Sequence, residues 1–202
     1  KVIKDKTTIK INDINIFYSL VDSLKLPSRW RLRLKRHFWR HDYFDELIAR
    51  LELNSDLQKN VFELDKKSYF KMKEIKQNNK IAGRKVSEIL NRFEKKIEEP
   101  RSNINGVRVA QIIRDFLKIN CLFKNAKNEL KKFEIKNKIN LKLNQFDIFN
   151  LKIKNNNAMF STNIGRSVEY YTGLVFEIYK KSKSLNLASG GRYDNLMQTL
   201  GA

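Results

Sequence analysis

Aromatic hydroxyls, arginines and paired glycines gather in two short segments near the end of this 202-residue chain. Residues 166–171 read Arg-Ser-Val-Glu-Tyr-Tyr, and residues 188–194 read Ala-Ser-Gly-Gly-Arg-Tyr-Asp. The groups that could contact a ligand are Arg166, Glu169, Tyr170 and Tyr171 in the first segment and Gly190, Gly191, Arg192 and Tyr193 in the second. Glycine lets the backbone approach a small molecule closely, and a few polar groups orient that molecule. The pattern therefore predicts a pocket for a small polar molecule, although a well-packed hairpin corner explains it equally well.

A β-hairpin is the element expected to hold these two segments together. Val175, Phe176, Ile178 and Tyr179 favour a strand, and turn residues flank this run on both sides. Residues 185–189 predict a return strand, which would bring the second segment back beside the first. Leucine and methionine at positions 196, 197 and 200 then predict a helix from residue 193 to residue 200.

Together with residues 172–177 (Thr-Gly-Leu-Val-Phe-Glu), the two segments resemble the histidine-recognition motifs of the histidyl-tRNA synthetase family. This family includes a paralogue of the synthetase, the regulatory subunit of ATP phosphoribosyltransferase. Two motifs in the right order and spacing are more specific than a single glycine-rich match. The resemblance implies an α+β fold of the class II aminoacyl-tRNA synthetase type, an antiparallel sheet with flanking helices and a long helical insertion. It also implies that Tyr171 and Tyr193 surround a histidine side chain and that Arg166 meets a carboxylate.

Other segments favour the regulatory branch of this family. Residues 9–27, residues 32–51 and Ala82-Gly83-Arg84 resemble that branch, although Asn12-Asp13 stands where a Gly-Asp pair is usual. The Arg-Asn-Pro-Leu-Arg-like and Leu-Asp-Cys-Lys-like segments of the synthetases are missing from this interval. The three residues after Arg166 are Ser, Val and Glu, where synthetases have Gly, Leu and Asp. The retained arginine is therefore not evidence of amino-acid activation.

The resemblance thus implies a regulatory subunit that performs no chemistry and needs no cofactor. Such a subunit self-associates through its synthetase-like core and joins the short-form catalytic subunit of ATP phosphoribosyltransferase in a hetero-octamer. It supports that subunit and conveys histidine feedback in the biosynthesis of histidine. The effector histidine would bind either in the predicted pocket or at a subunit interface. A divergent histidyl-tRNA synthetase that uses ATP, histidine and tRNA is one alternative, and a basic RNA-binding module is another.

Strand patterns occur at both ends of the chain, and helix patterns fill the middle. Residues 8–12 alternate as a strand, and Asp13 is placed to cap a helix that Pro27 ends. Poorly periodic residues 66–80 predict a weak helix or a loop, and clearer helices are expected at residues 28–40, 44–51, 86–97, 109–117, after Asn125, and at 139–146. We therefore expect a core domain from residues 1–26 and 151–202, split by a helical insertion at residues 27–150.

The ends of the sequence also fit this resemblance. The chain does not begin with Met, and it stops at Leu-Gly-Ala, where a synthetase-like core should continue. We therefore expect an internal fragment of a longer protein.

The net charge of +20 invites comparison with nucleic-acid-binding proteins, but the positive charge is spread along the chain. A local concentration lies in the helix expected at residues 28–40. There Arg29, Arg33 and Arg36 could bind phosphates, lie in solvent or contact a partner protein. We assign them as a candidate partner contact and do not expect nucleic acid as a partner. A membrane is not expected either, because no run of about 18 apolar residues occurs.

The single cysteine and the two histidines offer little ligand chemistry. Cys121 excludes an internal disulfide and fits a reducing, cytoplasmic compartment. It follows an apolar helix face, which predicts a buried and unreactive thiol. His37 and His41 have the i, i+4 spacing that can hold zinc on one helix face. No cysteine cluster joins them, and we assign no metal site.

Overall fold

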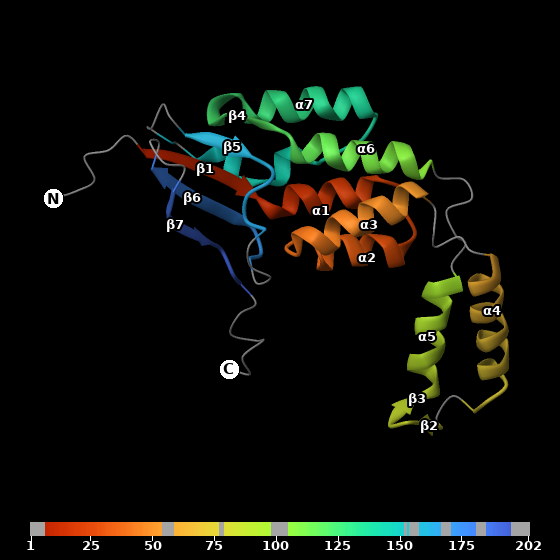
Figure 1. The fold of residues 1–202 in the computed structure, drawn as a ribbon. Helices are drawn as coiled ribbons and strands as arrows, with labels where there is room; N and C mark the ends of the chain where they lie inside the picture. The colour runs from red at the N-terminus through yellow and green to blue at the C-terminus, as the bar shows by residue number, and fades with distance from the viewer. Residues whose placement is uncertain are drawn as a thin grey trace.

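The computed structural model describes residues 7–53, 59–76, 79–97, 105–151, 153, 158–166, 171–180 and 185–194. Its main feature is a five-stranded sheet with the strand order β4-β5-β1-β6-β7. The strands are β1 (Thr7–Asp13), β4 (Asn120–Leu122), β5 (Met159–Ser161), β6 (Leu174–Lys180) and β7 (Leu185–Gly191). β1 lies at the centre, antiparallel to β6 along its whole length and parallel to β5 (Figure 1). Strands that are far apart in the sequence therefore form the middle of one sheet.

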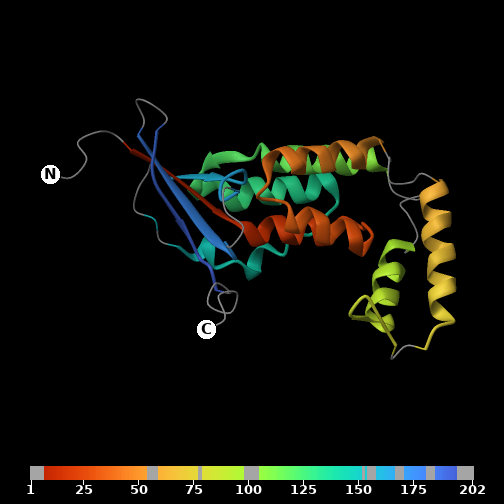
Figure 2. The same ribbon diagram turned by 60° about the horizontal axis from the view of Figure 1, so that its bottom comes forward.

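Five helices gather at one side of this sheet (Figure 2). They are α1 (Ile14–Ser23), α2 (Ser28–Arg36), α3 (His41–Leu53), α6 (Gly106–Leu117) and α7 (Ala126–Asn137). A 3-10 turn, η2 (Phe123–Asn125), leads into α7. No helix in the described part of the chain is both long enough and apolar enough to cross a membrane.

One hydrophobic core joins the sheet to these helices. At its centre the Phe17 ring of α1 stacks on Phe38, with ring centroids 3.9 Å apart. The same ring meets Phe44 and Phe116 at centroid distances of 5.7 and 6.2 Å. Because such aromatic pairs add to the burial of apolar area, this cluster ties α1 to the α2–α3 turn, to α3 and to α6.

The α+β class is confirmed, and so are the strand and the capped helix at the start of the chain and the hairpin near its end. Asp13 caps α1, since its Oδ1 accepts a hydrogen bond from the amide of Asn15 at 2.9 Å. β6 and β7 form the predicted hairpin, with an irregularity between Ile178 and Tyr179. The sheet differs from a purely antiparallel one by the single parallel pair, β1 with β5. The helix expected from residue 193 to residue 200 lies largely outside the described residues.

The middle of the chain is less uniformly helical than predicted. β4 pairs with β5, and its three residues are too few to show a strand pattern in the sequence. Instead of a helix at 139–146 the chain forms two 3-10 turns, η3 (Leu143–Gln145) and η4 (Asp147–Asn150). The reason is that Lys138 and Lys142 adopt left-handed backbone angles, with φ of 56° and 52°, which a helix excludes. Asn125 precedes α7, but its side chain makes no capping hydrogen bond.

A second group of elements lies apart from the sheet (Figure 1). It consists of α4 (Lys59–Lys73), the hairpin of β2 (Lys80–Ile81) and β3 (Arg84–Lys85), and α5 (Val86–Ile97). Helix-favouring Lys, Glu and Met make α4 a regular helix despite its weak periodicity. Val86 and Leu90 are buried outside the main core, whereas α2, α3, α6 and α7 share that core with β1. We call residues 59–97 the α4–α5 module. The predicted domain boundaries at residues 26 and 150 stay a prediction.

Candidate functional site

The start of α1 joins the two segments that were predicted to bind a ligand. The amide of Ile14 donates to the Gly173 carbonyl oxygen at 3.0 Å, and Asn15 Nδ2 donates to the Thr172 carbonyl oxygen at 2.9 Å. The amide of Thr172 in turn donates to the Arg192 carbonyl oxygen at 2.8 Å. The end of the first segment and the corner of the second are therefore held at one place. Asn15 was not predicted to do this, and only its position next to the helix cap hints at it.

Arg166 lies in the core, with 4% of its surface exposed. Its Nε donates to the Phe38 carbonyl oxygen at 2.8 Å, and its Nη1 donates to Asn163 Oδ1 at 2.9 Å. The guanidinium carbon lies 4.8 Å from the ring centroids of both Phe38 and Phe44, which is a cation–π arrangement. Burial lowers the pKa of Arg166, and the charge of Asp45 opposes this shift. Nη2 is buried without a hydrogen-bond partner in the described part of the chain.

A buried asparagine on β1 holds the segment that leads to Arg166. Asn12 Nδ2 lies 3.4 Å from the Thr162 carbonyl oxygen and 3.3 Å from that of Ile164 and donates to both. The Thr162 hydroxyl group donates to the Phe116 carbonyl oxygen and so ties the same segment to α6. Sequence reasoning noted Asn12 only as a departure from the family pattern and missed this role. The available signal is an uncharged polar side chain in a strand that packs into the core.

Aromatic rings of the chain itself cover the paired glycines of the second segment. A Cβ atom on Gly191 would lie 2.7 Å from Cδ1 of Tyr171, and one on Gly190 would lie 2.7 Å from Cζ of Phe176. Successive residues of a strand face opposite sides of the sheet, so the two glycines serve different contacts. Gly191 brings Tyr171 of the first segment against the second, whereas Gly190 lies on the other face.

A cavity of about 160 Å³ lies between α1, the α2–α3 turn and the beginning of the first segment. Its lining residues are Ile14, Tyr18, Lys35, Arg36, Phe38, Trp39, Gly165 and Tyr171. Arg166 adjoins the cavity through its neighbour Gly165 and its partner Phe38. Gly165 has a φ of 81°, and a Cβ atom there would lie 2.5 Å from Val175 Cγ2, so only glycine fits. The cavity is smaller than the roughly 300 Å³ at which ligand pockets usually begin.

The other residues of the predicted pocket do not line this cavity. Tyr193 is 51% exposed, and the exposed Arg192 pairs with Asp194 at 2.8 Å. Hydrogen bonds from Arg192 hold the pKa of the Asp194 carboxyl below its usual range. Glu169 and Tyr170 lie outside the described residues. Of the predicted residues, Tyr171 lines the cavity and lies against Gly191, and Arg166 adjoins the cavity only through Gly165 and Phe38. Gly190, Gly191, Arg192 and Tyr193 do not line it.

Two further titratable groups have shifted pKa values but do not line the cavity. Burial raises the pKa of Asp13, although the hydrogen bond from the Asn15 amide and the charge of Arg192 act against the shift. Cys121 lies on β4 and is half-buried rather than buried as predicted, and burial raises the pKa of its thiol. Neither group has the geometry of a nucleophile with an adjacent base.

His37 and His41 do not share one helix face, as their spacing predicted. α2 ends at Arg36, His37 follows it, and His41 begins α3. The amide of Phe38 turns to the Lys35 carbonyl oxygen at 3.4 Å, and the Phe38 carbonyl oxygen is bound by Arg166. Burial lowers the pKa of His41. Within the described residues, no group of three or more His, Cys, Asp or Glu side chains could hold a metal ion.

The arginines of α2 occupy different environments. Arg33 lies 3.5 Å from the Tyr43 hydroxyl group and 5.2 Å from the Trp30 ring centroid, so its guanidinium is engaged within the chain. Arg29 is partly buried, whereas Arg36 is exposed. Arg36 is therefore the most accessible member of the predicted partner contact.

Comparisons with known proteins relate this geometry to a family. A family model described as Histidyl-tRNA synthetase matches residues 42–202. Proteins named ATP phosphoribosyltransferase regulatory subunit, from Brucella anthropi and Brucella canis, are 28% and 29% identical to the chain over 214 residues. Both matches cover 96% of this chain and 57% of the relative, so the chain spans little more than half of their length.

A crystal structure of an ATP phosphoribosyltransferase regulatory subunit/histidyl-tRNA synthetase from Bacillus halodurans is also similar to the chain. Its TM-score is 0.45 and its identity 16%, and the match covers 98% of this chain and 40% of that one. The family model is the stronger finding, because it covers most of the chain, including both predicted ligand segments. The chain belongs to the histidyl-tRNA synthetase family.

Proposed function

We propose that the chain is part of a regulatory subunit of ATP phosphoribosyltransferase, that it performs no chemistry itself, and that it acts in histidine biosynthesis. The observation that carries this proposal is the name shared by the Brucella relatives, whose similarity extends over 96% of the chain. The altered residues after Arg166 and the missing synthetase segments support it from the sequence. A cytoplasmic location follows from this role and fits the free thiol of Cys121.

The partner that this role requires is the short-form catalytic subunit, joined in a hetero-octamer. The test is to mix the full-length protein with that subunit and to measure the mass of the assembly by sedimentation or native mass spectrometry. We expect a stable mixed complex, and two species that do not interact would refute the proposed role. Within that complex Arg36 is a candidate contact, together with Arg29 and Arg33. If all three can be changed to Gln without weakening assembly, only this contact is wrong.

We further propose that histidine binds at the cavity beside Arg166. Nη2 of Arg166 is a buried donor that could meet a carboxylate, and Tyr171 lines the cavity. Because the cavity is small, binding requires that it widen or that further residues complete it. Tyr171→Phe should weaken histidine binding by about 1 kcal/mol, or roughly five-fold, if its hydroxyl group is a buried partner.

Tyr193→Phe is the matched control, because Tyr193 is exposed in the second segment. Titration of histidine into the mixed complex by calorimetry measures both variants. Unchanged affinity in Tyr171→Phe would place the effector at a subunit interface instead.

A divergent histidyl-tRNA synthetase is the second candidate, because the matching family model carries that description. A synthetase activates histidine by forming an adenylate, with release of pyrophosphate. Histidine-dependent exchange of pyrophosphate into ATP therefore separates the two candidates. Exchange at a rate typical of a synthetase would support the enzyme and refute the regulatory role.

A further inference from the structure

The α4–α5 module carries a groove that the proposed effector site does not use. It has a volume of about 730 Å³ and lies between α4, the β2–β3 hairpin and α5. Met72, Ile81, Ile89 and Phe93 supply its apolar lining. All four side chains are only partly buried. The groove is therefore an apolar surface that the described part of the chain leaves accessible.

The side chains of the module that the structure describes cover this surface only in part. Of its side chains that the structure describes, only Val86 and Leu90 are buried. Both lie on α5, outside the main hydrophobic core. Because so few of the described side chains are buried, a further contact that covers apolar area would stabilise the module. A partner that covered Ile89 and Phe93 would supply such a contact.

The charges around the groove indicate what kind of partner fits. Arg84 and Arg92 contribute to its lining, both are exposed, and neither has an ion-pair partner within the described residues. Glu88 is the acidic residue of the lining. Residues 59–97 hold twelve Lys and Arg residues against five Asp and Glu residues. Since arginine binds carboxylates in a paired geometry, the surface is complementary to an acidic segment with apolar anchors.

Nucleic acid fits this groove less well than a protein segment does. Binding of single strands depends on exposed aromatic rings that stack on bases, along a positively charged track. Here Phe93 is half-buried, and the other apolar lining residues are aliphatic or Met. Methionine and isoleucine instead accommodate the apolar face of an amphipathic helix.

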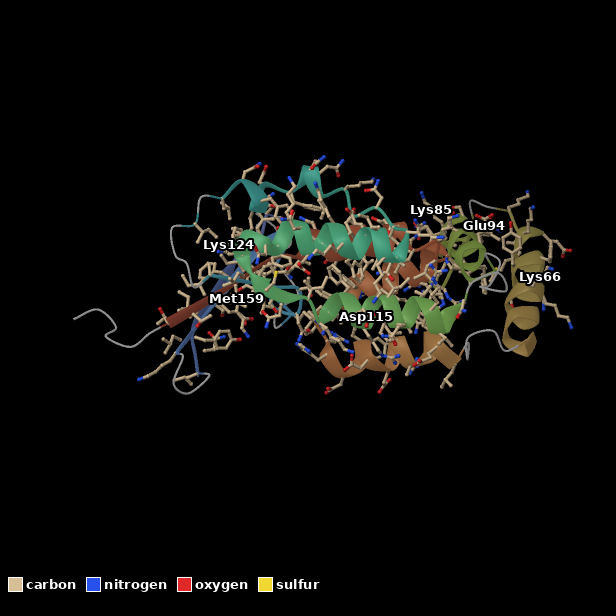
Figure 3. All side chains as sticks on the ribbon, turned by 90° about the horizontal axis from the view of Figure 1, so that it is seen from above. Lys66, Lys85, Glu94, Asp115, Lys124 and Met159 are labelled. Atoms are coloured by element: carbon tan, nitrogen blue, oxygen red, sulfur yellow. The ribbon has the colours of Figure 1, made fainter. Side chains whose placement is uncertain are left out.

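We propose that this groove receives an acidic, amphipathic segment of the catalytic partner subunit. The proposal rests on the proposed regulatory function, because it takes the partner from there. α5 also contacts α2, so the module adjoins the main body at the helix that carries the predicted partner-contact arginines. Figure 3 shows the module from above, with Lys66 on α4 and Lys85 and Glu94 on the side of α5.

The test compares two double variants of the full-length protein in assembly with the purified catalytic subunit. Arg84→Glu with Arg92→Glu reverses both charges of the groove, and we expect the dissociation constant to rise about ten-fold or more. The control is Lys67→Glu with Lys71→Glu. This control makes the same change of charge at exposed positions of α4 that do not line the groove. For this control we expect the dissociation constant to rise at most about three-fold, because only the long-range electrostatic attraction between the two proteins is reduced.

A third variant tests the apolar lining of the groove separately from its charge. Met72→Gln places an uncharged polar side chain of similar length on the lining of the groove, and it should weaken assembly without any change of charge. Helix content measured by circular dichroism shows whether each variant remains folded. For any variant that does not, Arg84→Gln with Arg92→Gln replaces it, because these two side chains are exposed.

Each outcome decides between definite alternatives. If the wild-type protein assembles and the groove variants assemble equally well, the groove proposal is overturned while the regulatory function stands. If the wild-type protein does not assemble, both proposals fail. If the groove variants assemble normally but lose affinity for a transfer RNA transcript, the groove is a nucleic-acid site and the proposal is wrong.

Discussion

Replacing Arg166 by methionine separates a structural role of this arginine from a role in ligand binding alone. The guanidinium group joins the α2–α3 turn to the first predicted ligand segment through the Phe38 carbonyl oxygen and Asn163 Oδ1. Methionine has a similar length and can occupy the space between the rings of Phe38 and Phe44, but it donates no hydrogen bond. The variant therefore removes the polar contacts and changes the packing little.

The expected loss of stability follows from these contacts. Two hydrogen bonds from a charged donor contribute about 1.5–3 kcal/mol each. Two cation–π contacts add about 0.5–1 kcal/mol each. Against these stands the penalty of burying a charge, which is several kcal/mol and which methionine removes. We expect a net decrease of about 2–3 kcal/mol in the free energy of unfolding.

Urea denaturation measures this change directly. With a slope of about 2 kcal/mol per M, the midpoint should fall by about 1 M. Arg192→Met is the matched control, because it makes the same substitution at an exposed arginine of the second segment. We expect no measurable shift of the midpoint for this control. An Arg166→Met protein that unfolds at the wild-type midpoint would refute the structural role and leave ligand binding as the reason for this arginine.

Three further predictions concern the backbone and the cap of α1. Gly165→Ala and Gly83→Ala impose similar strain, since φ is 81° and 79°, but only at residue 165 does the new Cβ meet another side chain. Urea denaturation should therefore show that the free energy of unfolding falls by about 1 kcal/mol for Gly83→Ala and by about 1–3 kcal/mol more for Gly165→Ala. Equal decreases for the two variants would contradict the packing argument. Gly191→Ala should lower the melting temperature more than Gly190→Ala, because the ring above residue 190 is 38% exposed and can swing away. Asp13→Asn keeps a residue that caps helices well. The pKa of Asp13 is raised in the folded protein, so the wild-type protein becomes less stable as the pH rises through that pKa and the buried carboxyl ionises. The variant should thus be at least as stable as the wild type at pH 7, and its relative advantage should disappear on acidification toward 3.8, the pKa of an unperturbed aspartate.

The strands near the two ends of the chain and the helix cap were predictable because their signals are local. Asp13 precedes an apolar helix pattern, and the run from Val175 to Tyr179 is a strand by composition. β4 was not predictable, because three residues carry no period and the strand exists only by pairing with β5. The left-handed angles at Lys138 and Lys142 gave no signal either, since lysine rarely adopts them.

The candidate site was predicted only in part, for a related reason. Residues of the two matched segments could be named from the sequence, but their partners could not. Arg166 is held by a backbone carbonyl 128 residues away, and Asn12 by carbonyls about 150 residues away. Every residue has a backbone carbonyl oxygen, so the sequence does not reveal which of them accept these hydrogen bonds. The exposure of Tyr193 could not be predicted either, because a sequence motif gives the identity of a residue and not the conformation of the chain around it.

The environment of Arg166 also bears on which branch of the family this chain represents. Two of its three nitrogens, Nε and Nη1, are committed to neutral acceptors within the chain, and aromatic rings lie close to the guanidinium group. Activation of an amino acid requires stabilisation of charge that develops during the reaction, by donors aimed at the reacting groups. With Nη2 alone free of a partner in the described residues, Arg166 could orient a carboxylate by a hydrogen bond. That geometry suits recognition of an amino-acid effector better than catalysis, and it favours the regulatory role over the synthetase.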